Sequence, residues 1–345
     1  MLLVLVFICC AVFALDDEAL LPVCDMLDDR QRHNDGQWVD VADASPLEWR
    51  ACDSTRLYNA FQMNLECHFK GADPLRLVWK PRLCRLLPFD ATAFFVRLNG
   101  HRLDLVGDSI STQMYVNLQC ALEQAGVLDL NHTYNRLSPL RSRPELAAVD
   151  PVTGVETVHT SFLYELHDGA LDYDRPERWY HNDRKRILVL NTGAWFNRNK
   201  VHTLGITDVR PHQVEQWFER TIKHMLDVTL ANFHGVVIFR SISPAHEDCG
   251  VALPAADVGA FAWEQFRRRN EFVRQQLRGR ARTYYLDIEP LSEGRSDGHP
   301  GSLGLSHDCF HWCNPGPTSV LNTWTDALFT MITQLREVGV LDTTV

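Results

Sequence analysis

Four short aliphatic runs, each followed by a polar turn and a helical stretch, constrain the fold of this chain more than any other feature. The runs are Arg102–Val106, Arg186–Leu190, Gly235–Phe239 and Thr283–Asp287. Apolar runs without alternation are typical of strands that are buried on both faces, as in parallel sheets. Because a helix follows each strand, the pattern predicts right-handed crossovers and a three-layer α/β/α sandwich around a central parallel sheet.

The covering helices are marked by apolar residues three and four positions apart. Two such stripes are Val214, Phe218, Ile222, Met225 and Leu321, Trp324, Leu328, Met331, Leu335. Pro315 and Pro317 end the segment before the second stripe and leave Thr318 or Ser319 to cap its helix. The arginine-rich run 266–282 is typical of a solvated amphipathic helix, with contact to an acidic polymer as the alternative.

The N-terminus carries an uncharged apolar run over residues 2–15, followed at once by acidic residues. We expect residues 1–15 to be a signal peptide or a short anchor, because the run is shorter than the roughly twenty residues of a spanning helix. Either form delivers the chain to the lumen of the secretory pathway, in the Golgi or outside the cell. The sequon at Asn131 predicts glycosylation there, and a net charge of -10 argues against nucleic acid as a partner.

Cysteine usage agrees with an oxidising compartment. Of ten cysteines, two lie in the apolar run, which leaves eight, and an even number in a luminal chain predicts four disulfides. Residues 16–90 hold half of these eight, are rich in Trp and show little helical or strand period. We expect them to wrap the core as a disulfide-pinned N-terminal segment, with residues 91–345 forming the main domain.

Two motifs about two hundred residues apart carry the chemistry. Gly107, Asp108 and Ser109 follow the first strand, where Gly107 allows a sharp turn and Ser109 begins a helix. Asp308 and His311 are three residues apart, so on a helical turn their side chains face the same way. A serine nucleophile needs an imidazole as base and a carboxylate to orient that imidazole. The motifs therefore predict a catalytic triad, although a capped strand-to-helix turn would also explain the first motif.

Other strand ends supply polar groups to the same edge of the sheet. Asn191 and Gly193 follow the second strand as candidate oxyanion donors, or as a turn-forming pair. Arg240 follows the third, where it would orient a substrate, brace the site or form a structural ion pair.

Two residue sets have a functional and a structural interpretation. His307, Cys309, His311 and Cys313 alternate as zinc ligands can, but disulfide-bonded cysteines are the favoured interpretation, so no metal is expected. Six tryptophans are candidates for stacking on sugar rings or for packing: Trp38, Trp49, Trp79, Trp179, Trp195 and Trp312.

The motifs and their surroundings resemble the trichome birefringence-like proteins, a PC-esterase branch of the GDSL/SGNH hydrolase superfamily. The resemblance runs from Cys24 to about Leu335. Its blocks are residues 24–25, 78–81, 105–111, 190–193, 240–246 and 286–291, and the most specific are 295–301 and 308–316. Two blocks depart from the family pattern. Where the family reads G-D-S-x-x-R-N-Q this chain has T-Q-M at 112–114, and where it reads N-T-G-H-W-W this chain has A-W-F at 194–196. We expect these departures to alter the acceptor-sugar groove.

The resemblance implies an O-acetyltransferase acting on polysaccharide hydroxyls through an acetyl-serine intermediate. The alternatives are a carbohydrate O-acetylesterase and a non-catalytic polysaccharide-binding protein on the same scaffold. It implies Ser109 as nucleophile, His311 as base, Asp308 as orienting carboxylate, and Asn191 with the Ser109 amide as oxyanion donors. It also implies an acetyl donor as co-substrate, with no tightly bound cofactor. The implied disulfides are Cys24–Cys84, Cys52–Cys120, Cys67–Cys313 and Cys249–Cys309.

Overall fold

The computed structural model describes twelve stretches of the chain, on which all structural statements below rest. They are residues 21–28, 32–40, 77–126, 134–137, 144–149, 156–162, 184–198, 208–247, 249–250, 262–303, 307–313 and 319–342. The leader 1–15 and Asn131 lie outside these stretches, so the expectations stated for them remain predictions. Within the stretches, no helix combines the length and the apolar character needed to cross a bilayer.

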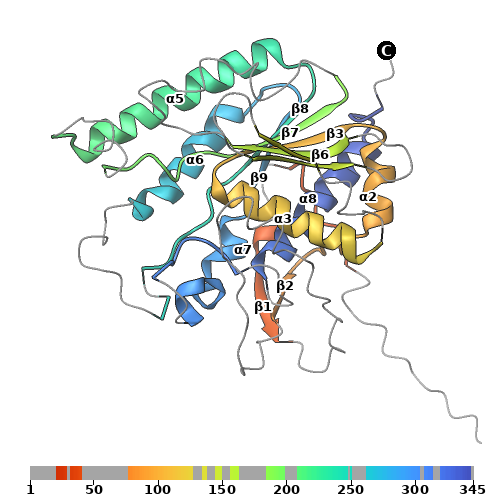
Figure 1. Cartoon of the computed structure of the whole chain (residues 1–345), viewed down its shortest axis with the longest axis horizontal. Coiled ribbons are helices and arrows are strands. Elements are labelled where there is room, and N and C mark those ends of the chain that lie inside the picture. Colours follow the sequence, from red (N-terminus) through yellow and green to blue (C-terminus); the bar gives the residue numbers. More distant parts are fainter. Residues whose placement is uncertain are drawn as a thin grey trace, which may run out of the picture.

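A seven-stranded sheet runs through the centre of the molecule (Figure 1). Its spatial order is β4 (Tyr134–Leu137), β5 (Pro144–Val149), β6 (Glu156–Phe162), β3 (Arg102–Gly107), β7 (Arg186–Leu190), β8 (Val236–Arg240) and β9 (Thr283–Leu286). From β6 to β9 neighbouring strands are parallel, whereas β5 is antiparallel to both β4 and β6. The predicted parallel sheet is confirmed, while β4, β5 and β6 were not predicted because no comparable aliphatic run marks them.

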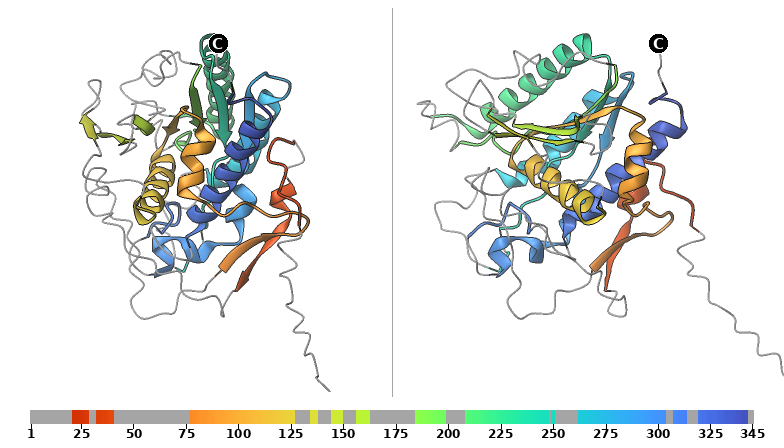
Figure 2. Two further views of the ribbon diagram at one scale, coloured as in Figure 1. Left: turned by 90° about the vertical axis from the view of Figure 1, so that its right-hand side faces the viewer. Right: turned by 45° about the vertical axis from the view of Figure 1, so that its right-hand side comes forward.

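Helices cover both faces of this sheet, as the three-layer prediction requires (Figures 1 and 2). One side holds α2 (Ala91–Leu98), α3 (Ser109–Gln124) and α8 (Val320–Glu337), and the other holds α5 (Pro211–Asn232) and α6 (Phe266–Leu277). Alternate residues of one strand enter different cores. Ile187 and Val189 belong to the cluster that includes α3 and α8, whereas Leu188 and Leu190 belong to the cluster that includes α5 and α6. Burial on both sides explains why β7 has apolar residues at consecutive positions.

The predicted helix boundaries agree with the structure at α8 and differ at α6. Ser319 is the N-cap of α8 and accepts a hydrogen bond from the N–H of Leu321 at 3.2 Å. The arginine-rich helix α6 ends at Leu277, so the last arginines of the run lie in the turn before β9. Its Arg269 is buried, contrary to a fully solvated polar face, and is neutralised by an ion pair with Glu215 of α5.

The N-terminal segment forms a small sheet that its sequence did not predict. β1 (Gly36–Asp40) pairs antiparallel with β2 (Leu77–Pro81), and Trp38 faces Trp79 across the pair. The indole of Trp79 is largely buried and donates to the carbonyl of His33 at 2.9 Å. Trp79 therefore has a packing role, the second of the two interpretations given above for the tryptophans.

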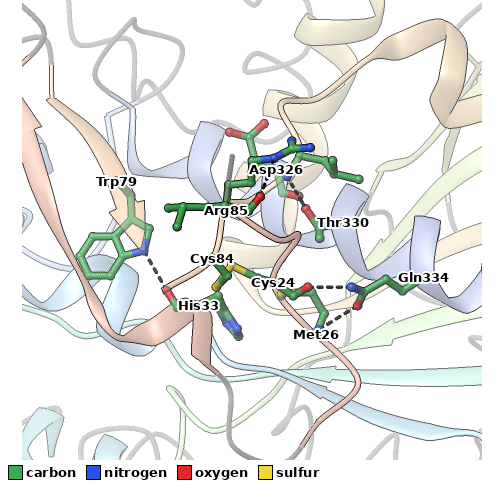
Figure 3. Close-up of a disulfide and its surroundings, with 11 residues drawn as sticks. Cys24, Met26, His33, Trp79, Cys84, Arg85, Asp326, Thr330 and Gln334 are labelled. Carbon is green, nitrogen blue, oxygen red and sulfur yellow. Dashed lines mark hydrogen bonds between the residues drawn. A yellow bond between two sulfur atoms is a disulfide. The ribbon is translucent and has the colours of Figure 1, made fainter. Parts of the chain in front are cut away.

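A disulfide closes this segment on itself, and a glutamine of α8 binds it beside the disulfide (Figure 3). Cys24 is bonded to Cys84, as predicted, and the side-chain amide of Gln334 on α8 binds the backbone on either side of Asp25. That amide donates to the carbonyl of Cys24 at 2.7 Å and accepts from the N–H of Met26 at 2.8 Å. The described part of the segment is thus pinned against α8.

Candidate active site

The candidate nucleophile lies where β3 passes into α3. Asp108 is the N-cap of α3, and its Oδ1 accepts a hydrogen bond from the N–H of Ile110 at 3.0 Å, so Ser109 becomes the first residue of the helix. Gly107 is required by space, because an added Cβ would lie 2.7 Å from the backbone oxygen of Asn191 and would also strike the hydroxyl of Ser111. The turn is capped, as the structural interpretation requires, and the catalytic role of Ser109 remains a prediction.

Ser109, His311 and Asp308 form one continuous hydrogen-bonded chain. The Ser109 Oγ lies 2.7 Å from Nε2 of His311, and the His311 Nδ1 lies 2.7 Å from Oδ2 of Asp308. A carboxylate can only accept, so Nδ1 carries the proton and Nε2 offers its lone pair to the serine hydroxyl. The histidine and aspartate side chains retain 22% and 27% exposure, so a substrate can reach the imidazole.

The local structure around Asp308 differs from the expectation. Residues 307–313 form an irregular loop and not a helical turn. The second carboxylate oxygen of Asp308 accepts from the N–H groups of Phe310 and His311 at 3.0 and 2.9 Å, which is what aligns the two side chains. Burial alone would raise the pKa of Asp308, but these bonds and the His311 ring hold that pKa well below its usual range. The carboxylate is therefore ionised whenever the imidazole is needed as a base.

Arg240 supports the turn of Ser109 from the interior of the protein, in agreement with one of its predicted roles. Its guanidinium is buried and donates to the carbonyl of Ser241 at 3.0 Å and to Oγ of Ser111 at 3.2 Å. Burial lowers the pKa of Arg240 to about 10, while the nearby charge of Asp108 opposes the shift. Burial likewise raises the pKa of Asp108, and Arg240 opposes that shift in turn. The two buried groups support the turn under Ser109 and do not face solvent.

Asn191 connects the ends of β7 and β8. Its side-chain amide donates to the carbonyls of Arg240 and Ser241 at 3.0 and 3.4 Å. Its role as an oxyanion donor stays a prediction, and it would require the amide to give up one of these bonds. The N–H of Ser109 is the better candidate for an oxyanion donor, because the first N–H groups of a helix have no acceptor within the helix.

Gly193 allows the backbone conformation of the turn after β7. Its φ of 134° is a conformation that side chains rarely allow, and an added Cβ would collide with Ile242. Its carbonyl accepts from the buried Arg269 at 2.8 Å. These contacts give Gly193 a structural reason to be glycine, beside the oxyanion role that remains a prediction.

A second disulfide holds the loop that carries the triad histidine. Cys249 is bonded to Cys309, next to Asp308, as predicted. Cys120 and Cys313 are also disulfide-bonded, while their predicted partners Cys52 and Cys67 lie outside the described residues. Because Cys309 and Cys313 are both oxidised, neither can serve as a thiolate ligand of zinc. No metal-binding cluster of His, Cys, Asp or Glu occurs among the described residues.

Gln113 supports the backbone beside His311, and the expectation that residues 112–114 alter the acceptor-sugar groove remains a prediction. Its side-chain amide makes two hydrogen bonds to the backbone of Trp312: Nε2 donates to the carbonyl at 2.6 Å, and Oε1 accepts from the N–H at 3.0 Å. Thr112, Gln113 and Met114 are all buried, so this departure from the family pattern faces the interior. A signal existed in the sequence, since Gln113 is polar and lies one helical turn after Ser109 on the same face.

The remaining tryptophans have different surroundings. Trp312 follows His311 in the loop and is fully buried, and Trp38 lies against the guanidinium of Arg295. Both therefore have packing roles. Trp195 is partly exposed in the turn after β7, and Trp49 and Trp179 lie outside the described residues. Trp263, which the sequence did not single out, is partly exposed and lies parallel to Phe310, the neighbour of His311.

A serine at the carboxyl end of a parallel strand, hydrogen-bonded to a His–Asp pair in a loop near the C-terminus, is the arrangement found in serine-dependent acyl-transfer enzymes. The chain matches PC-Esterase, the GDSL/SGNH-like acyl-esterase family found in Pmr5 and Cas1p, over residues 86–331. Since the match covers most of its length, the chain belongs to this family.

Curated relatives agree with this assignment. Protein trichome birefringence-like 13 of Arabidopsis thaliana is 25% identical over 85% of this chain and 82% of its own length. Trichome birefringence-like protein 7 of the same plant is 27% identical, over 84% of this chain and 71% of its own. Xyloglucan O-acetyltransferase 4 of Populus trichocarpa is 25% identical, over 77% and 73%. Together these findings indicate an enzyme of the acyl-esterase or acyltransferase type.

Proposed function

We propose that this protein is an O-acetyltransferase that acts on polysaccharide hydroxyls through an acetyl-Ser109 intermediate. The observation that carries the proposal is the hydrogen-bonded chain from Ser109 to His311 to Asp308, with both contacts at 2.7 Å. Membership of an acyl-esterase family and similarity to a xyloglucan O-acetyltransferase support the acyl group and the class of acceptor.

In the first half-reaction His311 acts as base and then as acid. Its Nε2 takes the Ser109 proton while Oγ attacks the acetyl carbonyl carbon of the donor. The N–H of Ser109 stabilises the oxyanion at the start of α3. The protonated ring then gives its proton to the leaving group, the bond between acetyl and donor breaks, and acetyl-Ser109 remains. Asp308 stays ionised throughout and stabilises the imidazolium.

In the second half-reaction a sugar hydroxyl replaces the donor. His311 takes the hydroxyl proton, the sugar oxygen attacks the acetyl carbonyl, and Ser109 Oγ leaves with the proton returned by the ring. Every bond that forms or breaks involves only the donor, the acceptor and these side chains, so we propose no tightly bound cofactor. We also propose that the protein acts in the lumen of the secretory pathway.

Aromatic side chains beside the imidazole support a carbohydrate acceptor. The ring of Phe310 lies 5.2 Å from that of His311, and Trp263 lies parallel to Phe310 at 6.5 Å. Both are partly exposed. Flat apolar faces next to a base can cover the apolar face of a sugar ring and shield acetyl-Ser109 from water.

The test is to incubate the protein with an aryl acetate, alone and with xylo-, manno-, xyloglucan- or galacturono-oligosaccharides. An acetylated oligosaccharide confirms transfer, whereas free acetate at the same rate with and without sugar means an esterase. Mass spectrometry of rapidly quenched protein should find one acetyl group on Ser109, and none in Ser109→Ala. Sugar binding that persists in that variant, with no turnover in either form, would support the non-catalytic alternative.

Asn191→Ala tests the predicted oxyanion donor separately. Loss of one such donor lowers turnover by about 10²–10³-fold. A smaller loss, accompanied by lower stability, would mean that Asn191 only joins β7 to β8. Circular dichroism of the same samples separates the two results.

A further inference from the structure

Two histidines outside the triad contact each other next to the His311 loop. His299 lies between the short helices η7 (Ser296–Gly298) and η8 (Pro300–Leu303) and is fully buried. His246 lies in the loop after β8 and is partly buried. The Nδ1 of His246 is 2.7 Å from Nε2 of His299. The indole of Trp312 packs on His299, with ring centroids 4.1 Å apart.

The outer nitrogens of the two rings contact backbone carbonyls. Nδ1 of His299 is 2.7 Å from the carbonyl oxygen of His311, and Nε2 of His246 is 2.8 Å from that of Glu293, the last residue of α7 (Glu289–Glu293). A continuous chain of three hydrogen bonds therefore runs from α7 to the backbone of the triad histidine.

The number of protons in this chain follows from its acceptors. Carbonyl oxygens only accept, so Nδ1 of His299 and Nε2 of His246 must both carry protons. The contact between the rings needs a third proton, whereas two neutral imidazoles carry two in total. All three bonds exist together only when the pair has one positive charge.

The extra proton belongs on His246. Burial lowers the pKa of His299 to about 3, so His299 is neutral and accepts at Nε2. Several charged groups surround the pair. The charges of Asp308 and His311 act on His299 from the loop. Glu293 of α7 forms an ion pair with Arg267, and Arg295 forms one with Asp297 of η7. Glu247 follows His246 in the sequence.

We propose that His246 and His299 are positioning residues that hold the carbonyl of His311 through one shared proton. When the pair loses this proton, two lone pairs face each other across 2.7 Å or one ring nitrogen faces a carbonyl. One of the three bonds then breaks, and the His311 backbone loses part of its support. This inference rests on the acyl transfer proposed above, because it concerns the base of that reaction.

The consequence is a bell-shaped dependence of kcat on pH. The acid limb follows from the need for a base in acyl transfer. The alkaline limb reports loss of the shared proton from the pair. His299→Ala removes the contact to His311 and should lower kcat by about 5- to 100-fold across the profile.

The decisive variant is His246→Asn. Its amide can donate to Nε2 of His299 without a titrating proton, so activity should persist while the alkaline limb disappears. His212→Asn, at an exposed histidine on α5, is the matched control and should keep the wild-type profile. An alkaline limb unchanged in His246→Asn overturns the proposal, and this variant answers the question even if His299→Ala does not fold.

Nitrogen NMR of ¹⁵N-histidine-labelled protein tests the shared proton without any turnover. Among the imidazolium signals, we expect one that disappears in His246→Asn and persists in His212→Asn. If both rings are neutral throughout the range in which the protein is folded, the pair holds no shared proton. This result is independent of acetyl transfer, so failure of the proposed function and failure of this inference are distinguishable.

Discussion

Ser109 and His311 meet in the candidate active site, but the chain holds them in opposite ways. Ser109 lies between a strand and a helix, and its position follows from the regular geometry of β3 and α3 with one N-cap. His311 lies in an irregular loop whose backbone is tied to distant segments by Gln113, His299 and the Cys249–Cys309 disulfide. A local signal therefore suffices for the nucleophile, whereas the base needs long-range contacts.

The largest expected effect comes from the orienting contact within the loop. Asp308→Asn replaces the acceptor that keeps the proton on Nδ1 of His311, so the ring would present the wrong tautomer to Ser109. Loss of this contact in serine-protease triads lowers turnover by about 10⁴-fold, and we expect a similar fall in kcat. The measurement is acetyl transfer by Asp308→Asn beside wild type, with melting temperatures for both. A fall of less than about tenfold would contradict the role given to Asp308.

Gly107→Ala tests the other side of the comparison. The new Cβ meets the backbone oxygen of Asn191 at 2.7 Å, so β3 and β7 must move apart beneath Ser109. A displacement of about 1 Å at a reacting group costs about 10²-fold in rate, and we expect kcat to fall by that order. Gly294→Ala is the control, because its added Cβ meets nothing closer than Trp38 at 3.9 Å. Equal kcat in both variants would show that the turn adapts.

The same difference explains what the sequence could predict. The strand runs, the helix stripes and Ser319 as a cap depend on neighbours within a few residues, and the structure confirms them. The contact between Gln113 and Trp312 spans 199 residues and that between His246 and His299 spans 53. No periodicity encodes such pairs, because they depend on how the loop is folded back onto α3 and α7.

Long-range and loop contacts also explain where the predictions from the sequence differ from the structure. The sequence predicts that Asp308 and His311 align on a helical turn, but hydrogen bonds from the N–H groups of the loop to Asp308 align them. A family pattern also does not show that Thr112–Met114 are buried on α3. β1 and β2 were missed because their pairing joins residues 36–40 to residues 77–81, which are far apart in the sequence.

The two described disulfides offer a matched test of long-range support. Cys24–Cys84 and Cys249–Cys309 both join residues 60 apart, so the loop-closure entropy lost on removal should be similar. We expect each double Cys→Ser variant to lose about 2–5 kcal/mol of unfolding free energy. Only removal of Cys249–Cys309 should also lower kcat, by about tenfold, because it releases the His311 loop.

Urea unfolding and acetyl transfer, measured on both double variants, check this difference. The Cys24–Cys84 pair is the control, since it joins two parts of the N-terminal segment and does not hold the His311 loop. If both variants lose kcat to the same extent, activity follows global stability and the loop has no special dependence on its disulfide.

Gln113→Met should have a smaller effect on the same loop. The substitution keeps the volume but leaves the N–H and the carbonyl of Trp312 without their side-chain partner, at a cost of about 1–3 kcal/mol. We expect a few-fold fall in kcat with this loss. Asn117→Leu is the control on the same helix, because Asn117 binds Thr325 of α8 and not the loop. A normal kcat in Gln113→Met would show that the other contacts suffice.

The smallest effect on activity is expected at Asp326 of α8, drawn in Figure 3, whose side chain binds the N–H of Phe89. Burial raises the pKa of Asp326 from 3.8 to about 7, although the N–H of Phe89 donates to its Oδ1 at 2.8 Å. A raised pKa means that the folded state binds the proton more tightly than the unfolded state. The protonated carboxyl therefore adds stability that is full below about pH 4 and is lost as the pH rises to about 7.

Asp326→Asn removes this titration and keeps an oxygen to accept from Phe89. We expect the variant to be more stable than wild type at pH 8, by on the order of 1–4 kcal/mol, with the difference disappearing near pH 4. Its kcat at pH 7 should equal that of wild type, because neither Ser109 nor the His311 loop contacts this side chain in the described structure. Urea titrations at both pH values provide the measurement. A stability gain that also raised kcat would mean that activity is limited by the whole fold, and the contrast between the turn of Ser109 and the loop of His311 would lose its explanatory value.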